Sequence, residues 1–284
     1  MKVLVTGARG QLGYDVMLEL ARRGHEAIGV DVQDMDITDA AACRRTIFSI
    51  APDAVIHCAA FTAVDAAQDC EETCRRVNAL GTEHVAKACA QLGIKMMYIS
   101  TDYVFGGQGE TPWQADCTDF APLSVYGQTK LEGEQAVVRL LDRYFIVRIA
   151  WVFGKNGKNF VRTMLALSEK HDTLRVVCDQ VGTPTYTPDL ARLLADMIET
   201  EKYGVYHATN EGGYLSWYEF ACEIFRLSGK MTQVLPVTTA EYGLSKAARP
   251  LNSRLDKGKL RACGFEPLPH WRDALARYLK EIGV

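Results

Sequence analysis

Residues 2–13 read Lys-Val-Leu-Val-Thr-Gly-Ala-Arg-Gly-Gln-Leu-Gly, and this stretch decides the fold. The first five residues are typical of a short buried strand, and Tyr14 to Arg23 then follows a helical pattern that Gly24 closes. A strand, a glycine turn and a helix form the first unit of a dinucleotide-binding fold, whose helix N-terminus faces a phosphate. Because the glycine spacing is G-x-x-G-x-x-G rather than G-x-G-x-x-G, a structural turn without a ligand is the alternative.

Strand and helix patterns alternate through the first half of the chain. Strands are predicted at 26–31, 53–59, 95–101 and 144–150, and helices at 40–50, 71–92 and 124–141. Such alternation indicates an α/β protein with a Rossmann-type, doubly wound parallel sheet. Residues 1–154 are predicted to form an NAD(P)-binding domain.

The second half is less regular. Helices are predicted at 159–170, 189–200, 216–228 and 271–282, and one short strand at 205–208. Residues 155–284 are therefore expected to form mainly a smaller α/β substrate-binding domain that interleaves with the first.

The composition excludes several classes of partner. The chain has 284 residues and a formal net charge of −3, so neither nucleic acid nor a membrane surface is expected as a partner. No apolar run reaches the ~18 residues of a membrane span, and the first strand starts too early for a signal peptide. The protein is expected to be cytoplasmic.

The nine cysteines are predicted to be free thiols. Cys70 and Cys74 have the spacing of half a metal site, but no second Cys/His pair with zinc spacing accompanies them, so no metal site is predicted. His57 lies in a buried strand pattern and is predicted to be a core histidine with satisfied hydrogen bonds.

Tyr126 and Lys130 are four residues apart in a predicted helix, so both leave one face. An ammonium group one turn away is expected to lower the pKa of the phenol and make it a general acid or base. Tyr and Lys are common on helices, so this spacing indicates a catalytic pair only because the same chain also carries the glycine motif at residues 7–13.

The cofactor is expected to be NADH, with NADPH as an alternative. Asp31 ends the second strand, where a carboxylate binds an adenosine ribose and repels a 2′-phosphate, but Arg9 could pair with that phosphate. Asp36 and Ile37 are expected beside the adenine, although Asp36 or Thr38 could simply cap the next helix. Small residues at 58–60 would let a cofactor approach the backbone.

These motifs together resemble the extended short-chain dehydrogenase/reductases, and within them the dTDP-4-dehydrorhamnose reductase family. The similarity covers nearly the whole chain. It rests on residues 7–13, Cys-Ala-Ala-Phe-Thr-Ala-Val-Asp at 58–65, Asn78, Ser-Thr-Asp-Tyr-Val-Phe at 100–105, and the 124–134 run around the Tyr/Lys pair. It continues with the runs at 151–154, 157–164, 179–185 and 248–255. Gly106-Gly107, and Arg-Ile-Ala before Trp151, depart from the usual family pattern.

The resemblance implies NAD(P)H-dependent reduction of the C4 ketone of a dTDP-linked 4-keto-6-deoxy sugar, a step in polysaccharide precursor synthesis. Tyr126, Lys130 and Thr101 would be catalytic. The cofactor would contact Gly7, Arg9, Gly10, Gln11, Leu12, Asp31, Asp36, Ile37, Cys58, Ala59, Ala60 and Thr62, together with Tyr126 and Lys130. The substrate would contact Thr101, Asp102, Val104, Phe105, Trp151, Asn159, Arg249 and Asn252.

Other functions of the same superfamily fit these motifs. The alternatives are a sugar-nucleotide epimerase or dehydratase, and a non-catalytic regulatory subunit. A monomer or a homodimer is expected. Some family members form Mg²⁺-linked dimers through acidic side chains, and no such set is identified in this sequence.

Overall fold

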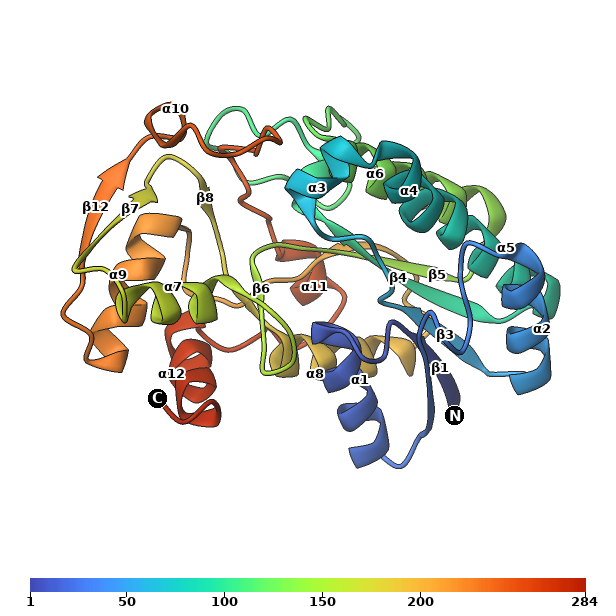
Figure 1. Cartoon of the computed structure of the whole chain (residues 1–284). Coiled ribbons are helices and arrows are strands. Elements are labelled where there is room, and N and C mark those ends of the chain that lie inside the picture. The colour runs from blue at the N-terminus through green and yellow to red at the C-terminus, as the bar shows by residue number, and fades with distance from the viewer.

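The computed structural model describes residues 1–284. Its centre is a six-stranded sheet in the order β10-β5-β4-β3-β1-β2, and every neighbouring pair is parallel (Figure 1). The strands are β1 (Lys2–Thr6), β2 (Glu26–Val30), β3 (Ala54–His57), β4 (Lys95–Thr101), β5 (Tyr144–Ile149) and β10 (Gly204–His207). The predicted Rossmann-type α/β sheet is therefore confirmed. The strand order reverses at β1, which pairs with β2 on one side and β3 on the other.

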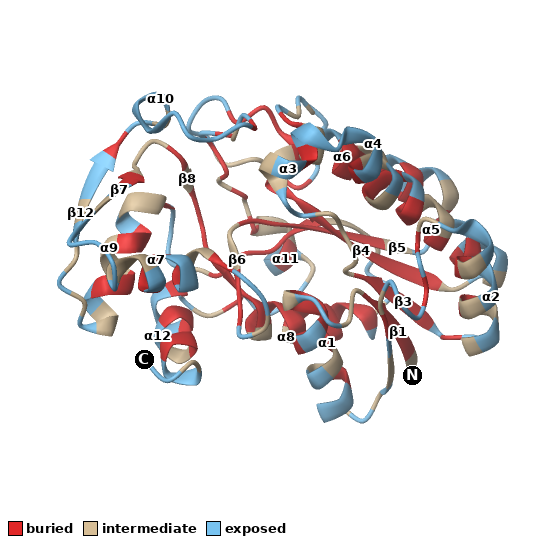
Figure 2. Cartoon of the chain, viewed as in Figure 1, coloured by how far each residue is buried: buried red, intermediate tan, exposed pale blue.

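Helices cover both faces of this sheet (Figure 1). One face packs on α1 (Gln11–Arg22) and α8 (Thr187–Ile198), and the other on α2 (Ala40–Ile50), α5 (Thr82–Leu92) and α6 (Val125–Leu140). Val3 and Val5 of β1 contribute to the first core while Leu4 contributes to the second, as the alternation of a pleated strand requires. Burial is therefore concentrated in the strands and the inner helix faces (Figure 2). None of the helices combines the length and apolarity needed to span a bilayer.

The rest of the second half forms a smaller lobe with its own core. Its helices are α7 (Phe160–Ser168), α9 (Trp217–Ser228), α10 (Thr239–Tyr242) and α12 (Trp271–Glu281). Its strands pair in twos: β7 (Thr173–Val177) with β12 (Gln233–Val237), β6 (Val152–Phe153) with β9 (Thr185–Tyr186), and β8 (Val181–Gly182) with β11 (Leu215–Ser216). The short helix α11 (Gly258–Ala262) packs near β10.

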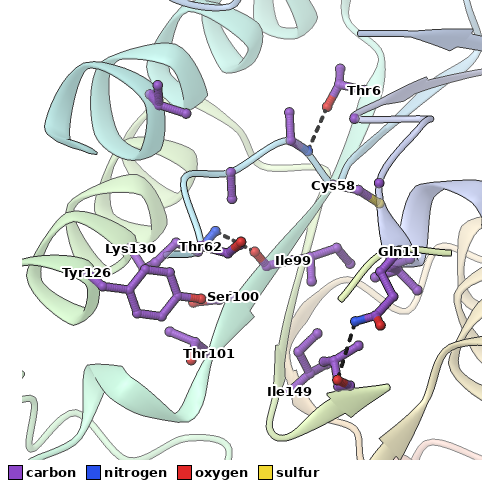
Figure 3. Close-up of a pocket in the computed structure, with 18 of the residues that line it drawn as sticks. Thr6, Gln11, Cys58, Thr62, Ile99, Ser100, Thr101, Tyr126, Lys130 and Ile149 are labelled. Carbon is purple, nitrogen blue, oxygen red and sulfur yellow. Dashed lines mark hydrogen bonds between the residues drawn. The ribbon is translucent and has the colours of Figure 1, made fainter. Parts of the chain in front are cut away.

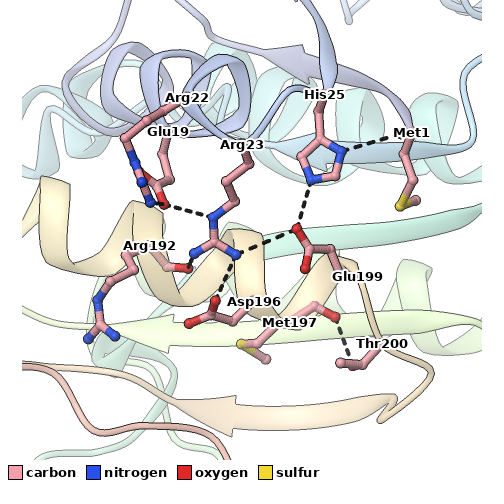
Figure 4. A network of polar contacts seen from close by, with 10 residues as sticks. All are labelled: Met1, Glu19, Arg22, Arg23, His25, Arg192, Asp196, Met197, Glu199 and Thr200. Carbon is pink, nitrogen blue, oxygen red and sulfur yellow. Dashed lines mark hydrogen bonds and ion pairs between the residues drawn. The ribbon is translucent and has the colours of Figure 1, made fainter.

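Two elements from beyond residue 154 return to the first domain. Strand β10 pairs with β5 at the sheet edge, and α8 packs on α1. Arg23 reinforces that contact, because its guanidinium lies 2.7 Å from both Glu19 of α1 and Asp196 of α8 (Figure 4). The domain boundary after Gly154 stays a prediction. Residues 187–207 follow that boundary in the sequence but pack with residues 1–154.

Most predicted helices differ from the structure by one or two residues at an end, and two differ more. Helix α1 begins at Gln11 rather than Tyr14, because Gly10 is an extended N-cap residue with φ −75° and ψ 178°. The predicted helix over 71–92 consists of α4 (Glu71–Arg75), a π-helical segment η1 (Arg76–Gly81) and α5, and the separate helix α3 (Val64–Asp69) precedes it. Single π turns inside helices often accompany functional sites.

Candidate active site

A pocket of about 740 Å³ opens beyond the carboxyl ends of β1, β3, β4 and β5, the edge at which doubly wound sheets bind ligands. Figure 3 shows side chains from several elements converging on it. Most of the predicted site residues line it: Gly7, Gly10, Gln11, Leu12, Asp31, Asp36, Ile37, Cys58, Ala59, Ala60, Thr62, Thr101, Asp102, Tyr126, Lys130 and Trp151. The others, Arg9, Val104, Phe105, Asn159, Arg249 and Asn252, do not.

The glycine loop is shaped for a close approach of backbone to ligand. Gly7 has φ +66°, and a Cβ there would lie 2.7 Å from the amide nitrogen of Ala59. A Cβ on Gly13 would lie 2.1 Å from the carbonyl oxygen of Gly7. No side chain caps the N-terminus of α1, so its first N–H groups remain available at the pocket. These features fit the pyrophosphate of a dinucleotide.

The loop between β6 and α7 closes the other side of the glycine loop. Asn156 Nδ2 donates to the carbonyl oxygen of Arg9 at 2.7 Å, and Gln11 Oε1 accepts from the Gly154 amide at 3.1 Å. Gly157 and Lys158 consequently line the pocket. Sequence reasoning missed both residues, because no local motif indicates that this loop folds back onto residues 9–11.

Asp31, which follows β2, lines the pocket and already accepts hydrogen bonds from the protein backbone. Asp31 accepts hydrogen bonds from the backbone amides of Arg9 at 3.1 Å and Val32 at 2.9 Å. The Arg9 guanidinium is 3.5 Å from Asp34 and hydrogen-bonds Gln33, and its side chain is 61% exposed. A turn of Arg9 toward a group bound beside Asp31 would therefore exchange these two exposed contacts for a new one.

The alternative that Asp36 or Thr38 caps the next helix is wrong. Asp39 is the N-cap of α2, and its carboxylate accepts from the amides of Ala41 and Ala42 at 2.8 and 3.2 Å. Asp36 instead closes a turn by accepting from the Thr38 amide at 2.9 Å. Asp36 and Ile37 both line the pocket.

Helix α6 presents Tyr126 and Lys130 to the pocket, as Figure 3 shows. Ser124 caps its N-terminus by accepting from the Gly127 amide at 3.2 Å. The ammonium group of Lys130 donates to the carbonyl oxygen of Ile99 at 2.7 Å and lies 4.0 Å from the ring centroid of Tyr98. Burial lowers the pKa of Lys130 to about 7.

The expected net lowering of the Tyr126 pKa is wrong for this structure, because burial sets the direction of the shift. The Tyr126 side chain is only partly exposed, through the pocket, and burial of its hydroxyl raises its pKa, while a contact with the Thr101 side chain lowers it less. The physical reason is that loss of hydration disfavours a phenolate and an ammonium alike. Tyr126 is therefore a neutral phenol near pH 7, the form that can donate a proton.

Three polar residues follow one another at the end of β4. Thr101 Oγ1 accepts from the Tyr103 amide at 3.2 Å and donates to Asp102 Oδ1 at 3.1 Å. Thr101 therefore makes a local backbone contact at its own strand end while also facing the pocket. Burial raises the pKa of Asp102 to about 6.

Two buried polar atoms of this strand end have no hydrogen-bond partner, Ser100 Oγ and Asp102 Oδ2. Both residues line the pocket and are only 2% exposed. Buried polar atoms are normally paired, and a hydrogen bond from the Ser253 side chain lowers the pKa of the Asp102 carboxyl, so the missing partner is best established for Ser100 Oγ. Sequence reasoning missed Ser100, whose only signal was its place beside Thr101.

Val104 and Phe105 lie in a hydrophobic cluster beneath the pocket. Both are fully buried, and the Phe105 ring stacks on Trp113 with centroids 4.6 Å apart. Packing accounts for both residues, and we do not retain them as substrate contacts. Trp113 has a packing role as well.

The remaining predicted substrate residues are held by structural contacts. Asn159 caps α7 and donates to Tyr278 Oη at 2.9 Å, and Asn252 donates to the Thr111 carbonyl oxygen at 2.9 Å. Arg249 forms a bidentate pair with Asp65, at 2.8 and 3.2 Å. Neither Asn159 nor Asn252 has a free polar group directed at the pocket.

Two further predictions concern His57 and metal binding, neither of which has a role in the proposed reaction. His57 is a satisfied core histidine, which confirms its prediction: it is 1% exposed, and its ring nitrogens lie 2.6 Å from Thr6 Oγ1 and 3.2 Å from Thr82 Oγ1. No cluster of three or more His, Cys, Asp or Glu side chains suitable for a metal ion occurs in the chain.

Asn78, on the π-helical segment, anchors the loop that follows β3. Its side chain accepts from the Phe61 amide at 2.8 Å and donates to Thr129 Oγ1 at 3.2 Å. It therefore links the 58–62 wall of the pocket to the helix that carries Tyr126 and Lys130. Asn78 is only 1% exposed on this segment.

Known proteins share both sequence and structure with this chain. Residues 1–284 match the model of the family described as RmlD substrate binding domain. A dTDP-4-dehydrorhamnose reductase of Streptomyces griseus is 43% identical over 278 residues, 96% of this chain and 91% of that protein. The crystal structure of a dTDP-4-dehydrorhamnose reductase from Clostridium acetobutylicum has a TM-score of 0.96 at 42% identity and covers 100% of both chains.

A second structure describes a relative with a cofactor. The Bacillus anthracis dTDP-4-dehydrorhamnose reductase in complex with NADP has a TM-score of 0.95 at 41% identity and covers 99% of this chain and 100% of its own. Together with the glycine loop and the Tyr126–Lys130 helix, these matches establish that the chain belongs to the RmlD family of extended short-chain dehydrogenase/reductases.

Proposed function

We propose that this protein reduces the C4 ketone of dTDP-4-dehydro-L-rhamnose to dTDP-L-rhamnose, with a reduced nicotinamide dinucleotide as cofactor. One observation carries the proposal: Thr101, Tyr126 and Lys130 reach the same pocket as the glycine loop. The names of the relatives support the choice of a keto sugar nucleotide as substrate.

The bound nicotinamide supplies hydride, and the protein supplies orientation and charge. The hydroxyl groups of Thr101 and Tyr126 would donate hydrogen bonds to the ketone oxygen, where negative charge develops during reduction. Tyr126 then transfers its proton to that oxygen, since its raised pKa keeps the phenol protonated near neutrality. Lys130 would hold positive charge next to the resulting phenolate and favour its formation.

We propose Asp102 as a contact to the sugar. Asp102 lines the pocket beside Thr101, whose hydroxyl donates to Asp102 Oδ1 at 3.1 Å, and its carboxyl would accept from a sugar hydroxyl. Trp151 would form an apolar wall of the same site. The glycine loop, Asp31, Asp36, Ile37 and residues 58–62 would bind the cofactor.

We propose NADH as the favoured cofactor and NADPH as an accepted one. Asp31 faces the pocket and would accept from a ribose hydroxyl, while the exposed Arg9 side chain is available to a 2′-phosphate. Comparing kcat/KM for the two cofactors tests this preference. Asp31→Asn should improve the use of NADPH relative to NADH, and an unchanged ratio would contradict the role of Asp31.

The test of the function is NADH oxidation with dTDP-4-dehydro-L-rhamnose, followed by identification of the product. Net NADH consumption is expected from a reductase and not from an epimerase. Tyr126→Phe should lower turnover by ~10²–10⁴ while NADH binding is retained, the range for loss of a general acid. Tyr242→Phe, an exposed tyrosine on α10, is the control. Wild-type turnover in Tyr126→Phe would refute the catalytic assignment, and NADH binding without oxidation by any keto sugar nucleotide would indicate a non-catalytic subunit.

A further inference from the structure

We propose that Trp217 and Gly182, neither of which lines the pocket, position the indole of Trp151 in the sugar site. The inference rests on the proposed function, because Trp151 would form the wall against which the keto sugar binds. Trp217 and Gly182 come from the small lobe, so the proposal assigns this lobe a direct part in shaping the reaction pocket.

The backbone of Trp151 has an uncommon conformation. Its φ angle is +51°, and Ala51 is the only other non-glycine residue with positive φ. A bulky residue in this region is strained, and such strain persists only when the surroundings impose it. Trp151 lies in the two-residue connection between β5 and β6 and lines the pocket, which places the strained residue at the proposed site of reaction.

An aromatic stack supports the indole from the side of the small lobe. The rings of Trp151 and Trp217 lie nearly parallel, with centroids 3.6 Å apart and an interplanar angle of 13°. Phe160 packs on Trp217 with a centroid distance of 4.5 Å. Trp217 is the first residue of α9, whose start is fixed by a capping box between Ser216 and Glu219. The support is therefore built on a rigid helix end.

Gly182 confines the same indole. A Cβ at Gly182 would lie 2.9 Å from Cε2 and 3.1 Å from Nε1 of Trp151, so any side chain would displace the ring. The backbone is held as well, because the Thr185 amide donates to the Trp151 carbonyl oxygen at 3.1 Å and Thr185 Oγ1 donates to the Ala150 carbonyl oxygen at 2.6 Å. Stack, glycine and backbone bonds together impose the strained conformation.

Removing one of these supports should let Trp151 relax toward an ordinary backbone conformation and withdraw its indole from the sugar. Gln11 contacts the Val152 backbone next to Trp151 at 3.3 Å, but neither Trp217 nor Gly182 touches the glycine loop in the contacts that hold the indole, so affinity for the dinucleotide should change less than affinity for the sugar. The expected signature is thus a selective loss of sugar binding. A general structural defect would weaken both substrates.

The experiment compares Trp217→Ala, Trp217→Phe and Gly182→Ala with the wild type. Two indoles stacked this closely should give an exciton couplet in far-UV circular dichroism. Trp217→Ala should abolish the couplet and raise KM for the keto sugar about tenfold or more, with KM for NADH changed less than about twofold. Trp217→Phe should lose the couplet but keep KM for the sugar near the wild-type value, because the phenyl ring restores the stack.

Gly182→Ala is the decisive variant, since it keeps both indoles and alters only their placement. It should weaken the couplet and raise KM for the sugar. Trp113→Phe is the matched control, because Trp113 stacks on Phe105 outside the pocket and should leave both readouts unchanged. A wild-type sugar KM in both Trp217→Ala and Gly182→Ala would overturn the proposal.

The failure of this inference is distinguishable from failure of the proposed function. If the wild type does not turn over the keto sugar, calorimetric binding of dTDP-L-rhamnose replaces KM as the readout, and the couplet is measured without any substrate. Loss of binding in Trp217→Ala and Gly182→Ala would then support the positioning role. Unchanged affinity in both variants would overturn it.

Discussion

Replacing Glu134 by glutamine should destabilise the protein by about 3–5 kcal/mol, the cost of breaking a buried ion pair. Glu134 lies on α6, one turn beyond Lys130, and binds Arg148 of β5 in bidentate geometry at 2.9 and 2.7 Å. The two side chains are only 4% and 2% exposed. This pair therefore ties the helix that carries Tyr126 and Lys130 to the central sheet.

The predicted loss of stability is large because no other negatively charged group could replace the Glu134 carboxylate beside Arg148. The other polar partners of Arg148 are the Ala115 carbonyl oxygen at 3.3 Å and His207 Nε2 at 3.4 Å. Burial lowers the pKa of His207 to about 3, so this ring is neutral near pH 7 and supplies no negative charge. In Glu134→Gln the Arg148 guanidinium would therefore remain buried without a negatively charged partner. A loss of this size is a large part of the ~5–15 kcal/mol that stabilises a typical protein.

Urea unfolding followed by far-UV circular dichroism at pH 7 measures the effect. Glu132→Gln is the matched control on the same helix, because Glu132 pairs with Arg75 at side-chain exposures of 23% and 39%. Its cost should be below about 1 kcal/mol, as for surface ion pairs. The double variant Glu134→Leu/Arg148→Met should recover much of the lost stability, since it leaves no buried charge. A cost below about 1 kcal/mol for Glu134→Gln would refute this reasoning.

Three further predictions concern the pocket. Gly7→Ala should weaken NADH binding at least about tenfold in a fluorescence titration, because it adds strain at φ +66° and places a Cβ 2.7 Å from the Ala59 amide nitrogen. Gly24→Ala is the control: Gly24 has φ +77° but no atom near its Cβ position, so NADH binding should stay intact. The free energy of unfolding should rise with pH between about 7 and 10.5, because the folded state binds fewer protons at Lys130 than the unfolded state there, and Lys130→Met should lose this contribution in urea titrations. For Asp102 the sign is opposite: its pKa is raised from 3.8 to about 6, so its contribution to stability falls as pH rises through that window. Asp102→Asn should flatten this dependence, and a profile identical to that of the wild type would contradict the burial of the carboxylate.

Local patterns were sufficient for much of the fold. The strand at 2–6 and the helix at 40–50 have the predicted bounds, because an apolar run or an amphipathic period is a property of neighbouring residues. The glycines at 7, 10 and 13 could be recognised for the same reason, since only glycine tolerates such close backbone contacts. The i, i+4 spacing likewise placed Tyr126 and Lys130 on one helix face.

Other features depend on residues far apart in the sequence. The return of β10 and α8 to the first domain, the fold of the 155–158 loop onto Arg9 and Gly10, and the strained Trp151 between Gly182 and Trp217 all require contacts across the chain. The strands β6, β8, β9 and β11 of the small lobe were missed because two residues carry no periodic signal, and the five-residue strands β7 and β12 were missed as well.

The sequence by itself determined the glycine turn, the order of strands and helices, and the shared face of Tyr126 and Lys130, because each depends on spacing along the backbone. Only the tertiary structure decided which polar atoms are buried without partners, and that the pKa of Tyr126 is raised while that of Lys130 is lowered. The physical reason is that hydration of a side chain depends on everything packed around it, and most of its neighbours in space are distant in the chain.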